Sequence, residues 1–358
     1  MKLLRSLPIG ILISSSLGLI PANLYAQIGD ASEEPVLPLR IGAADRAATG
    51  NYSNLKIHVL PSLNAAASPE HSLRGFSLPA DATSLANRSS ARADSEVEAV
   101  QPTNSTSAVP APGFYPADLT YNGGALLKSV QSNLIFINRP GRHWGHPGIF
   151  LKNLGMSTFI HTVDQYVGST ADNRYTVGVA AMIPYPTFDI LGNNDLLQIL
   201  HASATFFGSG YGRIFHVFLP KGVDYCFPDG TCYSPDIPST FFFCAFHGSV
   251  DFSDVGHVLF SLEPYQNVNG CSVEQPSPNG ALIDSTSNVL SHELIEAITD
   301  PDPPSGWVAQ KSLVEFGEEI GDICEDPFFK NPVSTLNGTK YGIQLEYSNK
   351  YHACANVP

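Results

Sequence analysis

Basic residues are scarce in this chain, and charged residues of any kind make up only 15% of its 358 positions. Lysine and arginine together number 19 against 33 aspartates and glutamates, which gives a formal net charge of -14. Proteins that bind nucleic acid or anionic membranes neutralise phosphate with basic side chains. The composition therefore argues against both kinds of partner, and it suits an exported protein that must stay soluble or one that holds cations.

Long hydrophobic runs are also lacking. The apolar run at residues 9–20 follows Lys2 and Arg5, and it is too short to span a bilayer as a stable anchor. A charged start, a short apolar core and a small residue at Ala26 are typical of a secretory signal peptide. We expect residues 1–26 to be such a signal, the mature protein to be secreted or periplasmic, and no membrane anchor to follow.

Two common enzyme motifs are absent. No Gly-x-Ser-x-Gly sequence occurs, so a Ser-His-Asp hydrolase of that type is not supported. The glycine-rich residues 208–212 precede a predicted strand instead of opening a helix, which argues against a phosphate-binding loop. The chemistry must therefore be sought elsewhere.

The chain divides by composition into three parts. After the signal, residues 27–114 are rich in Ala, Ser and Pro and lack apolar periodicity, which predicts a low-complexity linker or a pro-region with an isolated strand at 55–60. Residues 115–358 have the composition and apolar patterning of one globular domain. Strand patterns alternating with few helices predict an α/β (α+β) fold, a single mixed sheet packed on a long motif-bearing helix, zincin-like and stapled by disulfides.

The chain has six cysteines, an even number, and it is expected to be exported. An oxidising compartment favours disulfides over metal ligation by thiolates, although spacing alone does not prove the pairing. We expect each bridge to close one short segment, with the pairs Cys226–Cys232, Cys244–Cys271 and Cys324–Cys354.

The densest group of reactive side chains is His292, Glu293 and Glu296. In a helix the first and last of these lie on one face, where they can hold a divalent metal. Glu293 stands where zinc hydrolases keep their general base, so the pattern is the zincin motif H-E-x-x-H with Glu in place of the second His. Residues 285–287 are expected to cap this helix and Pro301 to end it.

A third ligand is expected from the acidic segment downstream. Glu319 is the first choice, with Glu318 as its alternative, and Asp322 is either a ligand or a hydrogen-bond partner of the ligating histidine. Asp302 offers a second route to a third ligand, whereas Asp300 is expected to brace the turn after the helix. The competing interpretation of the downstream segment is a solvated acidic loop.

Other histidines are harder to assign. His247 follows an aromatic strand pattern, so it is a further ligand, a transition-state donor or a residue that satisfies a local hydrogen bond. His201, His216 and His257 lie in apolar segments and are interpreted as core residues.

The ligand types leave the metal open. Zinc accepts both imidazole and carboxylate, but oxygen-rich sites also suit calcium as the alternative. The first hypothesis is a secreted metal-dependent hydrolase, a peptidase acting on a peptide or protein substrate, with Glu293 as general base. The second is a non-catalytic extracellular protein with a structural ion or none. The sequence leaves the oligomeric state open.

Several segments carry a family resemblance, spread over residues 119–354: 121–124, 243–249, 291–301, 319–324 and 347–354. They resemble a group of secreted bacterial and fungal proteins that is distantly similar to the phosphate-induced, EXORDIUM-like cell-wall proteins of plants. The resemblance implies an extracellular protein with a cell-wall association. The similarity to zincin metallopeptidases covers only the helix and Glu319, so it implies a mechanism and no common ancestry.

Overall fold

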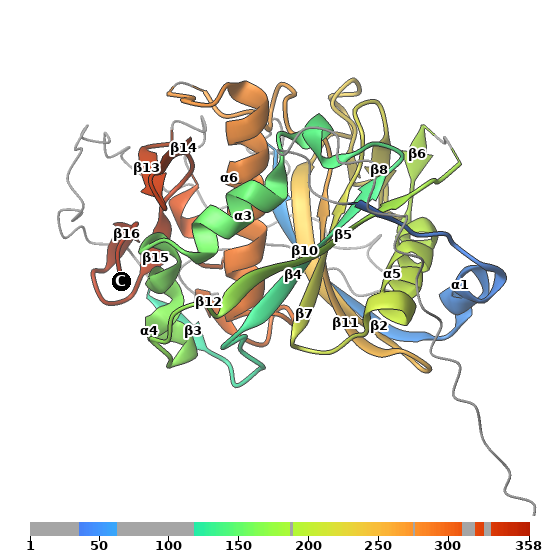
Figure 1. The fold of residues 1–358 in the computed structure, drawn as a ribbon, viewed down its shortest axis with the longest axis horizontal. Coiled ribbons are helices and arrows are strands. Elements are labelled where there is room, and N and C mark those ends of the chain that lie inside the picture. The colour runs from blue at the N-terminus through green and yellow to red at the C-terminus, as the bar shows by residue number, and fades with distance from the viewer. Residues whose placement is uncertain (1–35, 63–117, 187–188, 275, 310–318, 326–330) are drawn as a thin grey trace, which may run out of the picture. The chain divides into compact units, whose positions relative to one another are not determined.

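Seven strands form one mixed β-sheet in the described part of the chain (Figure 1). Five of them, β1, β5, β4, β7 and β11, run parallel, whereas β10 is antiparallel to both its neighbours, β11 and β2. Their order across the sheet is β1 (Val36–Pro38), β5 (Tyr175–Ile183), β4 (Val130–Ile137), β7 (Arg213–Phe218), β11 (Gly256–Glu263), β10 (Phe243–Phe252) and β2 (Tyr52–Pro61).

The structure is a computed structural model that describes residues 36–62, 118–186, 189–274, 276–309, 319–325 and 331–358. All of these belong to one compact unit, Glu34–Pro358. The expected signal peptide at 1–26, the expected linker residues 63–114 and Glu318 lie outside the described residues.

Both faces of the sheet are covered, which explains why its central strands are continuously apolar. In β4, Leu134 and Phe136 pack into the core on one face, and Ile135 and Ile137 pack into the core on the other. This alternation follows from the two-residue period of a strand. Figure 1 shows α6 (Ala281–Thr299) and α3 (Pro147–Gly155) on the first face and α5 (Asn193–Phe207) on the second.

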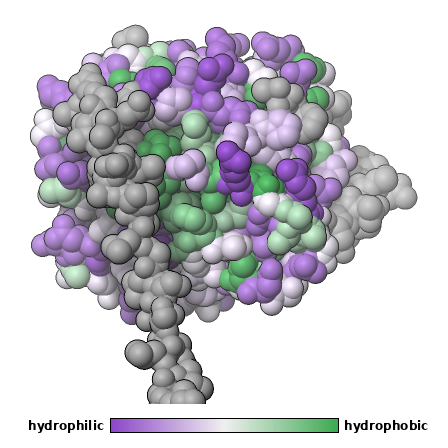
Figure 2. All heavy atoms as spheres, turned by 45° about the vertical axis from the view of Figure 1, so that its right-hand side comes forward, coloured by the Kyte–Doolittle hydropathy of each residue, from purple (hydrophilic) through white to green (hydrophobic). Residues whose placement is uncertain are grey.

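The remaining elements are short. The helices are α1 (Ala43–Ala47), α4 (Asp164–Val167), η2 (Ala48–Gly50), η3 (Gly141–Trp144), η4 (Phe159–Val163) and η5 (Asp322–Cys324). Small sheets join β12 (Trp307–Ala309) to β3 (Leu119–Tyr121), β13 (Val333–Leu336) to β14 (Thr339–Gly342), β15 (Glu346–Ser348) to β16 (Ala353–Ala355), and β6 (Ile190–Leu191) to β8 (Asp224–Cys226) and β9 (Cys232–Tyr233). On the face shown in Figure 2, polar residues surround a limited apolar area.

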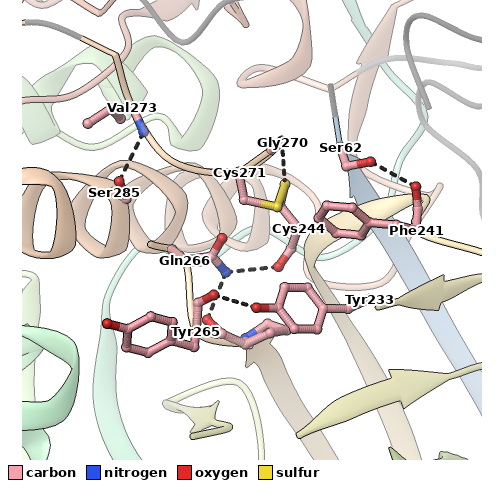
Figure 3. Close-up of a disulfide and its surroundings, with 11 residues drawn as sticks. Ser62, Tyr233, Phe241, Cys244, Tyr265, Gln266, Gly270, Cys271, Val273 and Ser285 are labelled. Atoms are coloured by element: carbon pink, nitrogen blue, oxygen red, sulfur yellow. Dashed lines mark hydrogen bonds between the residues drawn. A yellow bond between two sulfur atoms is a disulfide. The ribbon is translucent and has the colours of Figure 1, made fainter. Parts of the chain in front are cut away.

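The mixed α/β fold with few helices is confirmed, and so are all three disulfides: Cys226–Cys232, Cys244–Cys271 and Cys324–Cys354. Figure 3 shows how the second bridge and its surroundings fix β10 against the start of α6. Gln266 Nε2 donates to the carbonyl of Cys244 at 2.8 Å, and the Val273 amide donates to Ser285 Oγ at 2.9 Å.

Two expectations about boundaries are corrected. The motif helix begins at Ala281, so residues 285–287 are buried inside it instead of capping it, and Ser285 holds the preceding loop. The strand expected at 55–60 is not isolated in a linker, because it belongs to β2, an edge strand of the main sheet that pairs with β10. Its hydrogen-bonding partner is remote in sequence, so local composition did not reveal it.

Candidate metal centre

The helix α6 carries three of the candidate residues into the interior. His292, Glu293 and Glu296 are completely buried, and the four-residue spacing places His292 Nε2 3.1 Å from Glu296 Oε1. The helix ends where the sequence predicts, at Thr299, because Pro301 cannot continue it. A buried helix with such side chains requires polar partners from the elements that pack on it.

The sheet supplies two histidines. His247 on β10 and His58 on β2 are directly opposite each other in the antiparallel register, and their ring centroids are 5.6 Å apart. Directly opposed residues project from the same face of a sheet. The β2–β10 pairing therefore brings two imidazoles, both at most 1% exposed, next to the carboxylates of α6.

The segment around η5 supplies two carboxylates. Asp322 Oδ2 is 2.7 Å from His58 Nε2, and Glu319 Oε1 is 3.3 Å from His58 Nδ1. The amide of Asp322 donates to Glu296 Oε1 at 3.2 Å, and the amide of Glu319 donates to Asp322 Oδ2 at 3.0 Å. The first of these bonds joins the segment to a side chain of α6, and the second stabilises the turn within the segment.

These side chains form two overlapping groups with the spacing of metal ligands. One is His58, Glu296 and Asp322, the other is His247, Glu296 and Glu319, and within each group the ligand atoms lie within 4.8 Å of one another. Together with the remaining α6 residues they form what we call the seven-residue cluster: His58, His247, His292, Glu293, Glu296, Glu319 and Asp322. Each member is at most 2% exposed.

Two of the histidines have their tautomer fixed by outer hydrogen bonds. His247 Nε2 lies 3.1 Å from the carbonyl oxygen of Asp300, which can only accept, so this nitrogen carries the proton. His292 Nδ1 lies 3.3 Å from Gln344 Oε1, and Gln344 Nε2 donates to the Gly321 carbonyl at 2.9 Å. Since an amide oxygen also only accepts, each neutral ring presents its other nitrogen to the cluster, as ligating histidines do.

Many cluster atoms have no hydrogen-bond partner among the described residues. They include His292 Nε2 and at least one oxygen of every carboxylate of the cluster: Glu293 Oε1, Glu296 Oε2, both oxygens of Glu319 and Asp322 Oδ1. Buried polar atoms are normally paired, and each one left unpaired costs about 1–3 kcal/mol. Imidazole nitrogens and carboxylate oxygens aimed at a common space fit a divalent cation.

Burial and the closeness of the charged groups shift the pKa values of the cluster residues. Burial raises the pKa of Glu293 and of Glu319 well above the usual range, and neighbouring carboxylates raise the pKa of Glu319 further. Burial lowers the pKa of His292, but the carboxylate of Glu296 outweighs it and the net pKa is raised well above 6.5. Burial also opposes ionisation of Asp322, yet His58 lowers its pKa to about 2. Without a cation, protons offset part of the charge, so cation binding should release them.

The structure brings the predicted ligand residues together, but in different contacts from those expected. The structure brings His247 to the motif residues His292, Glu293 and Glu296, together with the downstream Glu319 and Asp322. The contacts differ from the expected trio of His292, Glu296 and Glu319, because His292 contacts Glu296 and Asp322 whereas Glu319 contacts the two sheet histidines.

Asp300 and Asp302 lie outside both ligand groups. Asp300 braces the turn after α6, as expected, by accepting a hydrogen bond from the Ser305 amide at 3.2 Å. Asp302 accepts hydrogen bonds at 2.5 Å from Ser249 and at 2.6 Å from Tyr211. The chain turns after Thr299, which directs the Asp302 carboxylate to this separate polar network.

The other histidines have local partners. His216 is buried between Ser132 and Ser261, and His201 is buried between Asp45 and Asp254. His257 is half-buried and lies 2.8 Å from Asp251 and 3.3 Å from Asp302. None of these three belongs to either ligand group of the described chain.

Sequence reasoning missed His58. The residue lies in the Leu-Lys-Ile-His-Val-Leu strand pattern, and a histidine in an apolar strand is the signal that could have identified it. The composition around this strand predicts a linker, and a linker gives a histidine no buried partner.

No family model matches this chain, and no curated protein or solved structure is significantly similar to it. No helix among the described residues has the length and apolar character needed to cross a membrane.

Proposed function

We propose that the protein is a secreted hydrolase that depends on a divalent cation held by the seven-residue cluster. The observation that carries this proposal is the convergence of three imidazoles and four carboxylates in a buried site where many ligand atoms lack hydrogen bonds. Zinc is the first candidate and calcium the alternative. The disulfides and the lack of a membrane-spanning helix in the described chain are compatible with an extracellular location.

Glu293 is the proposed general base. Its Oε2 is 3.3 Å from His247 Nδ1, and its Oε1 has no hydrogen-bond partner among the described residues, so one oxygen is free to accept a proton. Burial raises the pKa of Glu293 well above its ordinary value, which makes this carboxylate a stronger base than an exposed glutamate. A bound cation supplies Lewis acidity that lowers the pKa of water and polarises a carbonyl group.

A peptide or protein is the proposed substrate, because the motif on α6 differs from the peptidase pattern at one position only. Glutamate in place of the second histidine adds negative charge around the cation and weakens it as a Lewis acid. We therefore expect slow turnover. The resemblance to EXORDIUM-like proteins supports a location at the cell wall, where the same activity would act on extracellular proteins.

A structural ion is the second candidate function, and the complete burial of the ligands favours it. An ion at this position would join side chains from α6, β10, β2 and the η5 segment, four elements that are far apart in the sequence. The protein would then be a non-catalytic extracellular protein whose centre stabilises the fold.

Elemental analysis and one substitution separate the two candidates. The chain is expressed with export, purified without chelator and analysed for zinc, calcium, manganese and iron, and its hydrolysis of casein and a quenched fluorescent peptide library is measured. Glu293→Gln should retain the metal and lower turnover by about 10²–10⁴-fold. Asp302→Asn is the matched control, since this buried carboxylate lies outside both ligand groups and should keep metal and turnover.

Hydrolysis that survives Glu293→Gln would contradict the proposed base. Stoichiometric metal without any hydrolysis would establish the structural candidate, and a metal-free protein would contradict both.

A further inference from the structure

The seven-residue cluster has more donors than one ion uses. A zinc site takes four ligands, of which a catalytic site draws three from the protein. Here three imidazoles and four carboxylates are buried together, and five of these seven residues form two ligand groups that have Glu296 in common. A single small cation would leave several of these donors without a partner.

We propose that the cluster holds two divalent cations bridged by the carboxylate of Glu296. The first ion is bound by His58, His292 and Asp322, and the second by His247 and Glu319. This inference rests on the proposed metal-dependent function and deepens it, because it states how many ions the site takes and which residues hold each.

Each oxygen of Glu296 lies near an imidazole, as a bridging carboxylate requires, and Oε2 also lies 3.9 Å from His58 Nε2. Its Oε1 lies 3.1 Å from His292 Nε2, and its Oε2 lies 3.6 Å from His247 Nδ1. These are the nitrogens that the outer hydrogen bonds to Gln344 and to the Asp300 carbonyl leave free. Two ligating nitrogens therefore approach one carboxylate from two positions.

The other members sort to the same two positions. Asp322 Oδ1 is 3.6 Å from His292 Nε2, and Asp322 Oδ2 is 2.7 Å from His58 Nε2, which groups these three residues. On the second side, His247, Glu296 and Glu319 form one ligand group, whose ligand atoms lie within 4.8 Å of one another. Glu319 Oε1 is also 3.3 Å from His58 Nδ1, so Glu319 lies beside both sheet histidines. Two-metal hydrolytic sites hold their ions about 3.5–4 Å apart, a separation that a single bridging carboxylate spans.

Charge balance gives a second, independent argument. Glu293, Glu296, Glu319 and Asp322 are all at most 2% exposed, and ionised carboxylates without compensation are strongly unfavourable in such surroundings. One divalent ion offsets two of the cluster's four negative charges, whereas two ions offset all four while the histidines stay neutral. The completely buried Glu346, which interacts electrostatically with His292, Glu296 and Asp322, is a further carboxyl group beside the cluster. Both oxygens of Glu319 lack hydrogen-bond partners in the described chain, and Glu319 belongs to the ligand group of the second ion.

Metal counting on the full exported chain tests the inference. The protein is stripped with chelator, titrated with Co²⁺ followed by its visible absorption, and analysed for total metal after dialysis. We expect two equivalents per chain. With Mn²⁺, the magnetic resonance spectrum of the isolated ion should give way to that of a coupled pair when the second equivalent binds.

Substitutions assign each ion to its group. Asp322→Asn and His247→Gln should each reduce the count from two to one, and Glu296→Gln should weaken both ions. His216→Gln is the matched control, because His216 is equally buried in the same sheet and lies outside both ligand groups. Its hydrogen bonds in the described chain go to Ser132 and Ser261, and its Nδ1 is 4.0 Å from Glu263, so the variant should keep two.

The outcomes are distinguishable. One equivalent in the wild-type chain with metal-dependent hydrolysis would overturn the second ion and leave the proposed function standing. No bound metal would overturn both. Because the wild-type count and the Mn²⁺ spectrum involve no substitution, they test the inference even if a variant fails to fold.

Discussion

Replacing Gly321 with alanine should damage the candidate centre without removing any ligand. Gly321 lies just before η5 with an ordinary helical φ of -77°, so its backbone accepts a side chain. A Cβ at this position would lie 2.6 Å from His292 Nδ1, 2.8 Å from His292 Cε1 and 2.9 Å from Glu296 Oε1. The first distance is about 1 Å below the separation of roughly 3.5–4.0 Å at which carbon atoms pack best.

The expected magnitude follows from this overlap. Overpacking a buried site typically costs about 1–3 kcal/mol. Moving His292 aside would also break its 3.3 Å hydrogen bond to Gln344 and withdraw its ligating nitrogen from Glu296. Displacement of a reacting group by about 1 Å can lower a rate on the order of 10²-fold. We therefore expect lower stability, weaker metal binding and a large loss of turnover together.

The assay compares Gly321→Ala with Gly212→Ala in thermal unfolding, Co²⁺ titration and hydrolysis. A Cβ at Gly212 meets nothing within 4 Å, and its φ is outside the left-handed region, so this control should behave like the wild type or slightly better. If Gly321→Ala bound metal with unchanged affinity and melted with the control, the packing of His292 and Glu296 described above would be refuted.

Three further predictions concern stability. Chelation should lower the thermal midpoint, since an ion at 100 times its dissociation constant adds about 2.7 kcal/mol; an unchanged midpoint would argue that no ion supports the fold. Burial lowers the pKa of His201, but hydrogen bonds to Asp45 and Asp254 outweigh it and the net pKa is raised above 6.5. The stabilising effect of protonated His201 should thus be complete below pH 6.5 and fade as the pH rises through the raised pKa. The difference in melting temperature between wild type and His201→Gln should therefore shrink with rising pH, and a constant difference would contradict the prediction. Removing the Cys324–Cys354 disulfide, which spans 30 residues, should cost about 3.6 kcal/mol against about 2.2 kcal/mol for the 226–232 disulfide, which spans 6; denaturant titration that reverses this order would contradict the loop-entropy estimate.

Local sequence was sufficient for the parts of the site that one element builds. The α-helix fixes the relation of residues four apart, so the facing of His292 and Glu296 followed from spacing alone. The three disulfides were also predicted correctly, because each joins cysteines that bracket one compact segment, although spacing by itself does not prove the pairing. The start of α6 was predicted too late, because the hydroxyl residues 285–287 resemble a cap in sequence but are buried inside the helix, where Ser285 accepts a hydrogen bond from the preceding loop.

The rest of the centre depends on pairing between segments that are remote in sequence. His58 reaches it because β2 pairs with β10 in a register that sets His58 opposite His247, and a slip of β2 by one residue would turn the His58 imidazole to the other face. Asp302 is excluded because the chain turns away after α6 and its carboxylate bonds to Ser249 and Tyr211. Helical periodicity depends on residues close together in the sequence, whereas strand register depends on the packing of the whole sheet. The sequence therefore determined the motif on α6, and the tertiary structure decided which residues surround it.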